Sequence, residues 1–191
     1  MPRAGLTTAS VVREAADLTD EVGYDGLTLT MLAARLHVAV PSLYKHIGSL
    51  GDLRRSIAVA AVDELGTAMR DALRDAGGGT SRLQSLAGAF RDYARAHPGR
   101  YAATVRAASP EDLELQAASD RTLEPVFAVL EAGGLHGDGL VHAARGLRSA
   151  LHGFVTLEGA GGFGLPQDVD RSFERMVQDF EAGLAVRADR G

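Results

Sequence analysis

Residues 27–47 of the chain, LTLTMLAARLHVAVPSLYKHI, have the pattern of two short helices joined by a tight turn. Thr28 can cap the first helix, because its hydroxyl can accept a hydrogen bond from a free backbone N–H. Four apolar side chains follow at helical spacing and share one face: Leu29, Leu32, Ala33 and Leu36. Pro41 suits the first turn of the second helix, where its missing N–H leaves no hydrogen bond unmade. The stretch therefore predicts a helix-turn-helix.

The second of these helices carries side chains suited to a nucleic acid. Leu43 and Ile47 share its inner side, four residues apart. Its other side carries hydrogen-bonding or cationic groups: Ser42, Tyr44, Lys45 and His46. Groups of this kind contact phosphates and base edges. We therefore expect this helix to lie in a groove of double-stranded DNA.

The longer run GYDGLTLTMLAARLHVAVPSLYKHIGSLGDL, residues 23–53, resembles the DNA-binding domain of the TetR family of bacterial transcriptional repressors. In that family a Leu-Tyr-x-His sequence, here residues 43–46, marks the recognition helix. The similarity extends from about residue 8 to residue 53. Four residues differ from those usual in the family. His37 stands where glycine is usual, and Ala39 stands where serine or threonine is usual. Ile47 replaces an aromatic residue, and Leu50 replaces a lysine.

The resemblance and the side-chain chemistry together give a set of predicted DNA-binding residues: Thr28, Thr30, Pro41, Ser42, Tyr44, Lys45 and His46. Matching family positions imply phosphate contacts for Thr28, Thr30 and Tyr44. Ser42 and Lys45 are candidates for contacts to base edges. An alternative stays open for Tyr44, because its ring can also pack under the recognition helix.

Composition excludes several other classes of protein. The 191 residues suffice for a sizeable core, and 46% apolar with 24% charged residues is ordinary for a globular protein. No apolar run approaches the roughly 20 residues that span a bilayer. Charged residues interrupt the N-terminal segment before a signal-peptide core can form, so we expect a cytoplasmic protein without a membrane partner. The absence of cysteine excludes disulfides, thiolate catalysis and zinc fingers, and we expect neither a metal nor a cofactor.

The net charge of −5 is unevenly distributed. Residues 1–56 carry six basic and six acidic side chains, so the excess of acid lies in the remainder of the chain. Lys45 is the only lysine, and it lies in the second helix of the helix-turn-helix. This distribution suits a protein that contacts DNA at one end only.

The rest of the sequence predicts further helices and no strand, because period-two alternation and clusters of β-branched residues are absent. Thr7 or Thr8 can cap the first helix, and the glycine run 77–79 ends a long one that begins near residue 50. A short helix is expected over 100–108, and Ser109-Pro110-Glu111-Asp112 predicts the start of a helix that Pro125 should kink. We therefore predict an all-α chain of about nine helices. Residues 1–50 would form the helix-turn-helix DNA-binding domain and 51–191 a ligand-binding and dimerisation domain.

Two motifs extend the resemblance into the second domain. Leu151-His152-Gly153-Phe154 is similar to the Trp-His-Gly-Phe signature of one class of TetR-type C-terminal domains, and residues 97–101, HPGRY, match another element of that class. In such regulators the last two helices pair with those of a second subunit, which implies a homodimer here. A two-fold dimer would place two recognition helices about 34–36 Å apart. The expected interface residues, some of which can instead be intramolecular core, are Leu151, Phe154, Phe173, Met176, Val177 and Phe180.

The resemblance also implies a pocket for a small-molecule effector among the middle helices. Polar or aromatic side chains on otherwise apolar helices are the candidates: Phe90, Tyr93, Tyr101, Arg106, Phe127, His142, Arg145 and His152. The aromatic members can equally be core residues, and the arginines can be solvated.

We predict a DNA-binding repressor that binds a palindromic operator as a dimer and is released by a ligand. The sequence lacks the motifs of common enzyme classes, including Gly-x-Ser-x-Gly, a phosphate loop and His-Glu-x-x-His, so no enzyme is expected. The alternative is a helical protein-interaction module with a degenerate DNA-binding domain.

Overall fold

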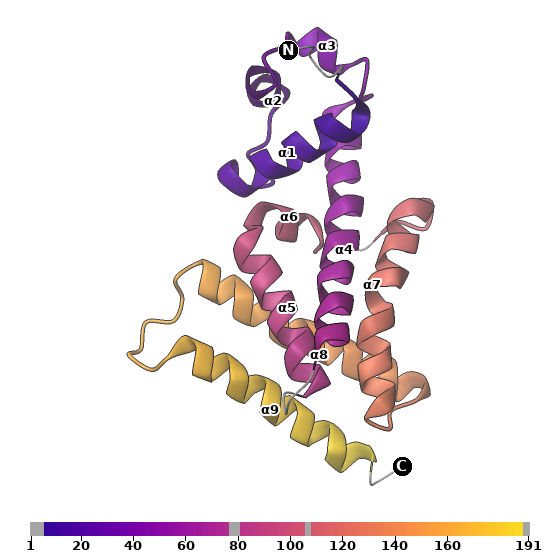
Figure 1. The fold of residues 1–191 in the computed structure, drawn as a ribbon, viewed down its shortest axis with the longest axis vertical. Coiled ribbons are helices and arrows are strands. Elements are labelled where there is room, and N and C mark those ends of the chain that lie inside the picture. Colours follow the sequence, from indigo (N-terminus) through magenta and orange to yellow (C-terminus); the bar gives the residue numbers. More distant parts are fainter. Residues whose placement is uncertain (1–5, 77–80, 106–107, 189–191) are drawn as a thin grey trace. The chain divides into compact units, whose positions relative to one another are not determined.

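The computed structural model describes residues 6–76, 81–105 and 108–188, and every regular element in these ranges is a helix (Figure 1). Nine helices lie in the described residues: α1 (Thr8–Val22), α2 (Leu29–Arg35), α3 (Val40–Leu43), α4 (Leu50–Asp75), α5 (Arg82–Ala96), α6 (Pro98–Ala103), α7 (Leu113–Ala132), α8 (Gly137–Gly159) and α9 (Val169–Ala188). The predicted all-α fold is confirmed. None of these helices has the length and apolar character needed to span a membrane.

The chain forms two compact units. The first contains residues 1–64 and 97–119, and the second contains 65–96 and 120–191. Helices α4 and α7 each contribute residues to both units. The domains expected from the sequence, 1–50 and 51–191, remain a proposal about how DNA binding and ligand binding are divided.

Local side-chain caps begin the first two helices. The Thr7 hydroxyl accepts a hydrogen bond from the Ser10 N–H at 3.1 Å, and the Ser10 hydroxyl accepts one from the Thr7 N–H at 2.9 Å. Thr28 caps α2 by accepting a bond from the Met31 N–H at 3.2 Å. Each cap typically stabilises a helix by about 1 kcal/mol. The positions of both caps agree with the sequence prediction.

Helix α2 ends at Arg35 and is followed, after Leu36, by His37, whose φ of 54° lies in the left-handed region. The Val38 N–H donates to the Ala33 carbonyl at 3.0 Å, and the His37 N–H donates to the Ala34 carbonyl at 3.1 Å. This pair of bonds is a Schellman motif, in which glycine is the usual left-handed residue because it has no Cβ. The motif explains why the related sequences usually have glycine where this chain has His37.

The core of the first unit is built from apolar side chains of α1 to α4. Its fully buried large residues include Val11, Leu27, Leu32, Leu43, Leu53 and Ile57. Full burial of one such side chain is worth about 1.5–3 kcal/mol. These residues hold the two helices of the helix-turn-helix against α1 and α4, so the predicted apolar faces serve as core.

Helix α6 packs closely on α1, and this contact explains the motif that begins at His97. A Cβ atom on Gly99 would collide with the backbone of Thr19, so only glycine permits this approach. The Asp20 carboxylate accepts a bond from the Arg100 N–H at 2.9 Å and lies 3.1 Å from Nδ1 of His97. The motif therefore holds α6 on α1 within the first unit.

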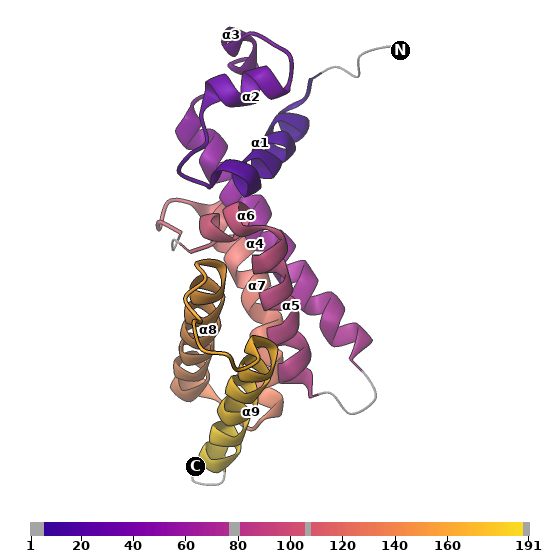
Figure 2. The same ribbon diagram turned by 90° about the vertical axis from the view of Figure 1, so that its left-hand side faces the viewer.

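In the second unit α5 lies beside α8 and α9 (Figure 2). Arg91, on α5, contacts side chains of both α8 and α9. The Arg91 side chain is 8% exposed. Its Nε donates to Glu158 at 2.9 Å, and its Nη2 lies 2.7 Å from Asp170. The guanidinium also lies over two rings, with its Cζ 5.5 Å from the centre of Phe154 and 4.8 Å from that of Phe173. A charged residue thus occupies the centre of the packing between these helices.

Helices α4 and α7 also approach closely in the second unit. A Cβ atom on Gly66 would lie 2.6 Å from Oγ1 of Thr122. Further along, the Arg70 guanidinium donates to the carbonyl of Arg121 at 2.8 Å. That carbonyl would normally accept the N–H of residue 125, which is a proline and has none. α7 continues through Pro125 as one helix, and Arg70 supplies the missing donor from α4.

The start of α7 differs from the prediction. The sequence predicts a cap at Ser109 with a first-turn proline, but the helix begins at Leu113. Asp112 is the residue that caps it, because its carboxylate accepts a bond from the Leu115 N–H at 3.1 Å. The same carboxylate lies 2.6 Å from Nη2 of Arg55, a contact 57 residues away that local sequence does not reveal.

The short helix α6 begins earlier and ends earlier than the predicted range 100–108. Pro98 occupies its first turn, a position that proline favours. The glycine run predicted to end α4, residues 77–79, lies outside the described residues.

Candidate nucleic-acid interface

The candidate recognition helix α3 is only four residues long and continues as a hydrogen-bonded turn. The Ser42 N–H donates to the Ala39 carbonyl at 2.8 Å, and the His46 N–H donates to the Leu43 carbonyl at 2.8 Å. Both bonds span three residues, which tightens the backbone relative to an α-helix. The predicted DNA contacts that follow Leu43 therefore lie in this turn rather than on the helix.

The turn is fixed to the rest of the first unit by its apolar side and by one polar bond. Leu43 is fully buried and Ile47 is buried. The Thr8 hydroxyl donates to the carbonyl of His46 at 3.1 Å, which ties the start of α1 to the turn. Sequence reasoning did not assign this role to Thr8, because a hydroxyl at a helix start is equally explained by capping.

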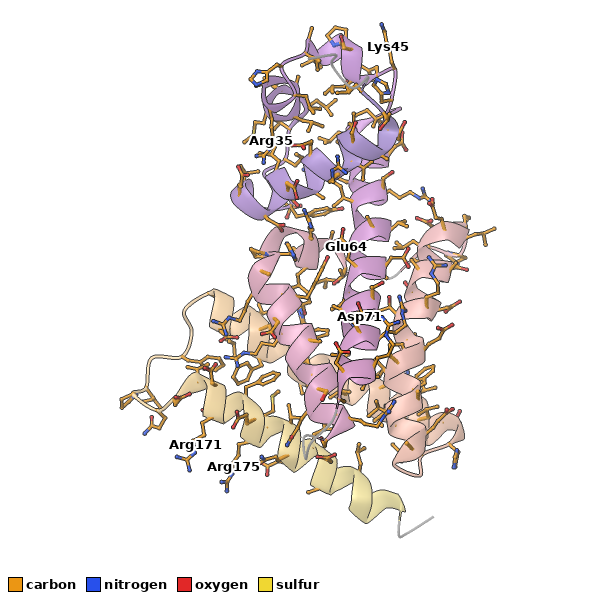
Figure 3. All side chains as sticks on the ribbon, in the orientation of Figure 1. Arg35, Lys45, Glu64, Asp71, Arg171 and Arg175 are labelled. Atoms are coloured by element: carbon orange, nitrogen blue, oxygen red, sulfur yellow. The ribbon has the colours of Figure 1, made fainter. Side chains whose placement is uncertain are left out.

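Several predicted DNA-binding side chains are open to a partner. Tyr44 is 55% exposed, so its ring is not packed under the recognition helix in the free chain. Lys45 is exposed and points away from the ribbon in Figure 3. Thr30 and Pro41 are also exposed, whereas Ser42 and His46 are half-buried. The turn can thus present one cation, one phenol and two partly covered polar groups.

Thr28 combines a structural role with a possible phosphate contact. Its oxygen accepts the Met31 N–H as the cap of α2, and the residue is exposed. A hydroxyl that accepts in a cap still has its own hydrogen to donate. The cap therefore leaves Thr28 able to donate to a phosphate oxygen.

Most arginines near the helix-turn-helix already have partners within the unit. Arg35 contacts Glu14 at 3.2 Å and Glu21 at 2.6 Å (Figure 3). Arg54 donates to the backbone carbonyl of Asp25 at 3.0 Å. The two carboxylates of α1 offset the charge of Arg35, whereas the bond to the Asp25 carbonyl orients Arg54 without neutralising it.

Arg55 is neutralised in the same way by the start of α7. Its Nη2 lies 2.6 Å from Asp112 and 3.0 Å from Glu114. The hydrogen bond from Arg55 holds the pKa of the Asp112 carboxyl below its ordinary value. Among the described residues of the helix-turn-helix and α1, Arg13 and Lys45 are the exposed cations without an ion pair.

Two departures from the usual family residues lie at the starts of α3 and α4. Ala39 is the N-cap of α3 and makes no side-chain cap bond. Leu50 is half-buried against the core at the start of α4, where a lysine would contact phosphate in the related sequences. The start of α4 is capped instead by Ser49, whose oxygen accepts the Asp52 N–H at 3.0 Å. Helix α4 therefore has a capped start, but its first residue provides no cation.

The predicted ligand-pocket residues fall into three groups in the structure. Phe90, Tyr93 and Tyr101 are buried, Phe127 and His152 are half-buried, and His142 and Arg145 are exposed on α8. Arg106 lies outside the described residues. A groove of about 600 Å³ lies elsewhere, between α5 and α9. Within the described residues no group of three or more His, Asp or Glu side chains could hold a metal ion.

The predicted dimer-interface residues are also divided. Leu151, Phe154, Phe173 and Val177 are buried within a single chain, where Phe154 and Phe173 meet edge to face at 5.1 Å. Met176 and Phe180 are half-buried. Phe154 and Phe173 lie against Arg91, so the burial of these two rings needs no second subunit. A partner would meet Met176, Phe180 and the exposed side chains beside them.

Comparison with known proteins identifies the family of the chain. Residues 83–180 match the family model described as the tetracyclin repressor-like C-terminal domain. Rv0681 of Mycobacterium tuberculosis, an HTH-type transcriptional regulator, is 40% identical over 98% of this chain and 86% of its own length. The chain belongs to the TetR family of transcriptional regulators.

Solved structures share the fold of this TetR-family chain. A protein from Rhodococcus sp. RHA1 superposes with a TM-score of 0.80, at 23% identity over 96% of this chain and 98% of its own. A TetR variant from Acinetobacter baumannii, solved with minocycline, has a TM-score of 0.67 at 24% identity over 94% and 96% of the two chains. The TetR-family assignment makes the chain a DNA-binding regulator of transcription and not an enzyme.

Proposed function

We propose that this regulator is a cytoplasmic repressor that binds a palindromic operator as a homodimer and is released by a small-molecule effector. The observation that carries the proposal is the anchored, exposed turn that follows α3. Leu43 and Ile47 fix its inner side, while Tyr44 and Lys45 face outward. A preformed surface of this kind loses little conformational entropy when it binds DNA.

Within the helix-turn-helix, side-chain chemistry divides the roles. Thr28, Thr30 and Tyr44 would donate to phosphate oxygens and set the position of the turn on the duplex. Lys45 would donate to guanine O6 or N7, and Ser42 to a neighbouring base edge. Lys45→Ala should therefore weaken binding or relax discrimination by about 1–3 kcal/mol.

Dimerisation is supported by the electrostatics of the first unit. With Arg13 and Lys45 as its exposed unpaired cations, one helix-turn-helix would neutralise few phosphates and bind weakly. A two-fold dimer doubles these contacts and matches an operator of two half-sites. Exposed residues of α8 and α9 would form the interface, with Met176 and Phe180 among them.

Release by a ligand is supported by what is known of relatives. The Acinetobacter TetR variant was solved with minocycline, and effector binding is typical of the family. A ligand would release DNA only if it bound the DNA-incompetent arrangement of the dimer more tightly than the DNA-bound one. The residues proposed to line its pocket are those predicted from the sequence, among them Phe127, His142 and His152.

The proposal is tested by titrating the full-length protein against DNA that flanks its own gene, at two salt concentrations, with fluorescence anisotropy. Tight, sequence-selective and salt-dependent binding is expected, and Tyr44→Ala should lose most of it. A matched control is Tyr24→Phe in the same unit, which keeps the ring and removes the hydroxyl that donates to the Arg54 carbonyl. Equal, weak binding of any DNA by all three proteins would contradict the proposal.

The neutralised arginines favour a second candidate function. Because Arg35 and Arg55 are paired with carboxylates, the first unit could serve a protein partner with no DNA affinity. The same titration separates the two functions, since an interaction module would bind operator and unrelated DNA equally.

A further inference from the structure

A groove of about 600 Å³ lies within the second unit, between α5 and α9, which lie side by side in Figure 2. This volume is within the usual range for small-molecule sites. Two buried apolar side chains of α9, Phe173 and Val177, line its floor. On the α5 side, a Cβ atom added to Gly88 would meet nothing within 4 Å outside its own stretch of helix. The groove thus has an apolar floor with open space above it, and it contains none of the residues predicted from the sequence to line a ligand pocket.

The groove is also lined by a buried cation that has donors to spare. The Arg91 side chain is only 8% exposed, and its bonds to Glu158 and Asp170 use Nε and Nη2. The two N–H groups of Nη1 therefore have no acceptor among the described residues. A donor in a largely buried side chain is costly to leave unpaired. An oxygen atom of a ligand in the groove can supply the acceptor that the chain does not.

The remaining charges of the groove favour a positive ligand. The charge of Arg91 is already matched by its two carboxylate partners. Two further carboxylates line the groove from opposite helices, Asp92 on α5 and Glu174 on α9. Both residues are exposed, and neither makes an ion pair with another described residue. The other cation is Arg95, which lies 3.9 Å from Asp170. Acidic groups therefore outnumber basic ones, and the free pair of carboxylates can bind an ammonium.

We propose that the groove between α5 and α9 binds an amphiphilic amine that also carries a carbonyl oxygen. The ammonium lies between Asp92 and Glu174, the carbonyl accepts from Nη1 of Arg91, and the apolar body covers Gly88 and Phe173. This inference names a site and a ligand class that the sequence did not indicate. It goes beyond the proposed function, because binding in the groove requires neither an operator nor the release of DNA.

The chemistry is tested with matched probes in isothermal titration calorimetry of the full-length protein. N-(aminobutyl)benzamide carries a ring, a carbonyl and an ammonium. It should bind about three- to tenfold more tightly than N-pentylbenzamide, in which a methyl group replaces the ammonium. The analogue that ends in a carboxylate should bind most weakly. The phenylalkyl amine of equal length, which lacks the carbonyl, should lose about fivefold in affinity, the value of one hydrogen bond.

Protein variants place the binding in the groove. Gly88→Leu should abolish it, because the new side chain fills the open space, and leucine is a better helix former than glycine. Asp92→Asn and Glu174→Gln should each weaken binding of the amine about threefold and leave N-pentylbenzamide unchanged. Asp179→Asn is the matched control, since it removes a carboxylate of α9 that is exposed outside the groove. Circular dichroism confirms that each variant keeps its helical content.

Each outcome decides for or against the site. A preference for the ammonium that is lost in Asp92→Asn and Glu174→Gln, and kept in Asp179→Asn, supports the inference. Equal affinities for the three charge analogues, binding that Gly88→Leu retains in full, or no binding of any probe at millimolar concentration overturn it. These results leave the proposed function untouched, since operator binding is measured separately. Failure to bind an operator would refute the proposed function without affecting the groove.

Discussion

Replacing Arg70 with methionine should destabilise the protein, but only while residue 125 is a proline. The Arg70 guanidinium donates to the Arg121 carbonyl at 2.8 Å, and Pro125, four residues further on, has no N–H for the usual α-helical bond to that carbonyl. The Arg70 guanidinium is oriented for this bond by a second one to the Thr67 hydroxyl at 2.9 Å. Methionine keeps most of the apolar stem and removes the donor.

The expected loss is about 1 kcal/mol, the net value of a hydrogen bond that is partly open to water. In a Pro125→Ala background the alanine N–H can bond the same carbonyl, so the cost of Arg70→Met should fall to a few tenths of a kcal/mol. The coupling energy between the two sites is then about 0.7 kcal/mol or more, within the range for residues that share a bond. The coupling energy does not depend on how much Pro125→Ala changes stability on its own.

Urea denaturation followed by circular dichroism measures all four proteins of the cycle at one protein concentration, because self-association would shift the apparent stability. For a slope near 2.5 kcal/mol per molar urea, the expected loss moves the midpoint by about 0.4 M. Arg74→Met is the matched control, since Arg74 pairs with Asp71 on its own helix. An Arg70→Met cost that is the same with proline and with alanine at position 125 would refute the reasoning.

Three further predictions concern other sites. His37→Gly should raise the free energy of unfolding by about 1 kcal/mol, because the left-handed conformation is costly for a residue with a Cβ; His37→Ala, which keeps the Cβ, should show no such gain in urea denaturation. Glu158→Gln should cost about 2 kcal/mol at neutral pH, since it leaves the buried Arg91 with one charged partner. The hydrogen bond from Arg91 holds the pKa of Glu158 below its ordinary value, so this stability is present at neutral pH and is lost as the pH falls through the lowered pKa. The wild type should therefore lose more stability than Glu158→Gln between about pH 6 and pH 3. Equal losses in the two proteins would count against the pairing. Lys45→Ala should relax discrimination at one base pair of each half-site and change the slope of log K against log salt by less than about 1 for the proposed dimer, because Lys45 is assigned to a base edge and not to a phosphate; a slope reduced by about 2 would reassign it to one phosphate contact per subunit.

The helix-turn-helix was predictable because its signals are local. Thr28, the apolar positions and Pro41 all lie within a few residues of the bonds they make, and the structure places them as expected. The two caps of α1 and α2 follow from the same short-range chemistry. Periodicity and capping therefore suffice for most of the first unit.

The parts that the sequence did not reveal depend on partners far along the chain. Arg91 and Glu158 are 67 residues apart, and an arginine in a helical sequence is ordinarily expected in solvent. Asp112 caps α7 in preference to Ser109 while Arg55 also holds its carboxylate, a bond that spans 57 residues. Four apolar residues expected at a dimer interface are already buried within the single chain, and two of them, Phe154 and Phe173, lie under the Arg91 guanidinium. An apolar stripe on a helix indicates burial but does not identify which surface buries it.

Because few cations of the described helix-turn-helix are free, the proposed dimer would have a particular thermodynamic role. In a two-fold dimer each substitution in the helix-turn-helix occurs twice, so a loss of about 1.4 kcal/mol per subunit becomes about 2.8 kcal/mol on a palindrome. The second subunit contributes only if both recognition segments reach their half-sites together, at an effective concentration set by the dimer geometry. Measuring Lys45→Ala on a full operator and on a half-site duplex therefore separates the contact from the assembly. A loss on the palindrome that is twice the loss on the half-site, in kcal/mol, requires two symmetric contacts, whereas equal losses require that only one subunit binds.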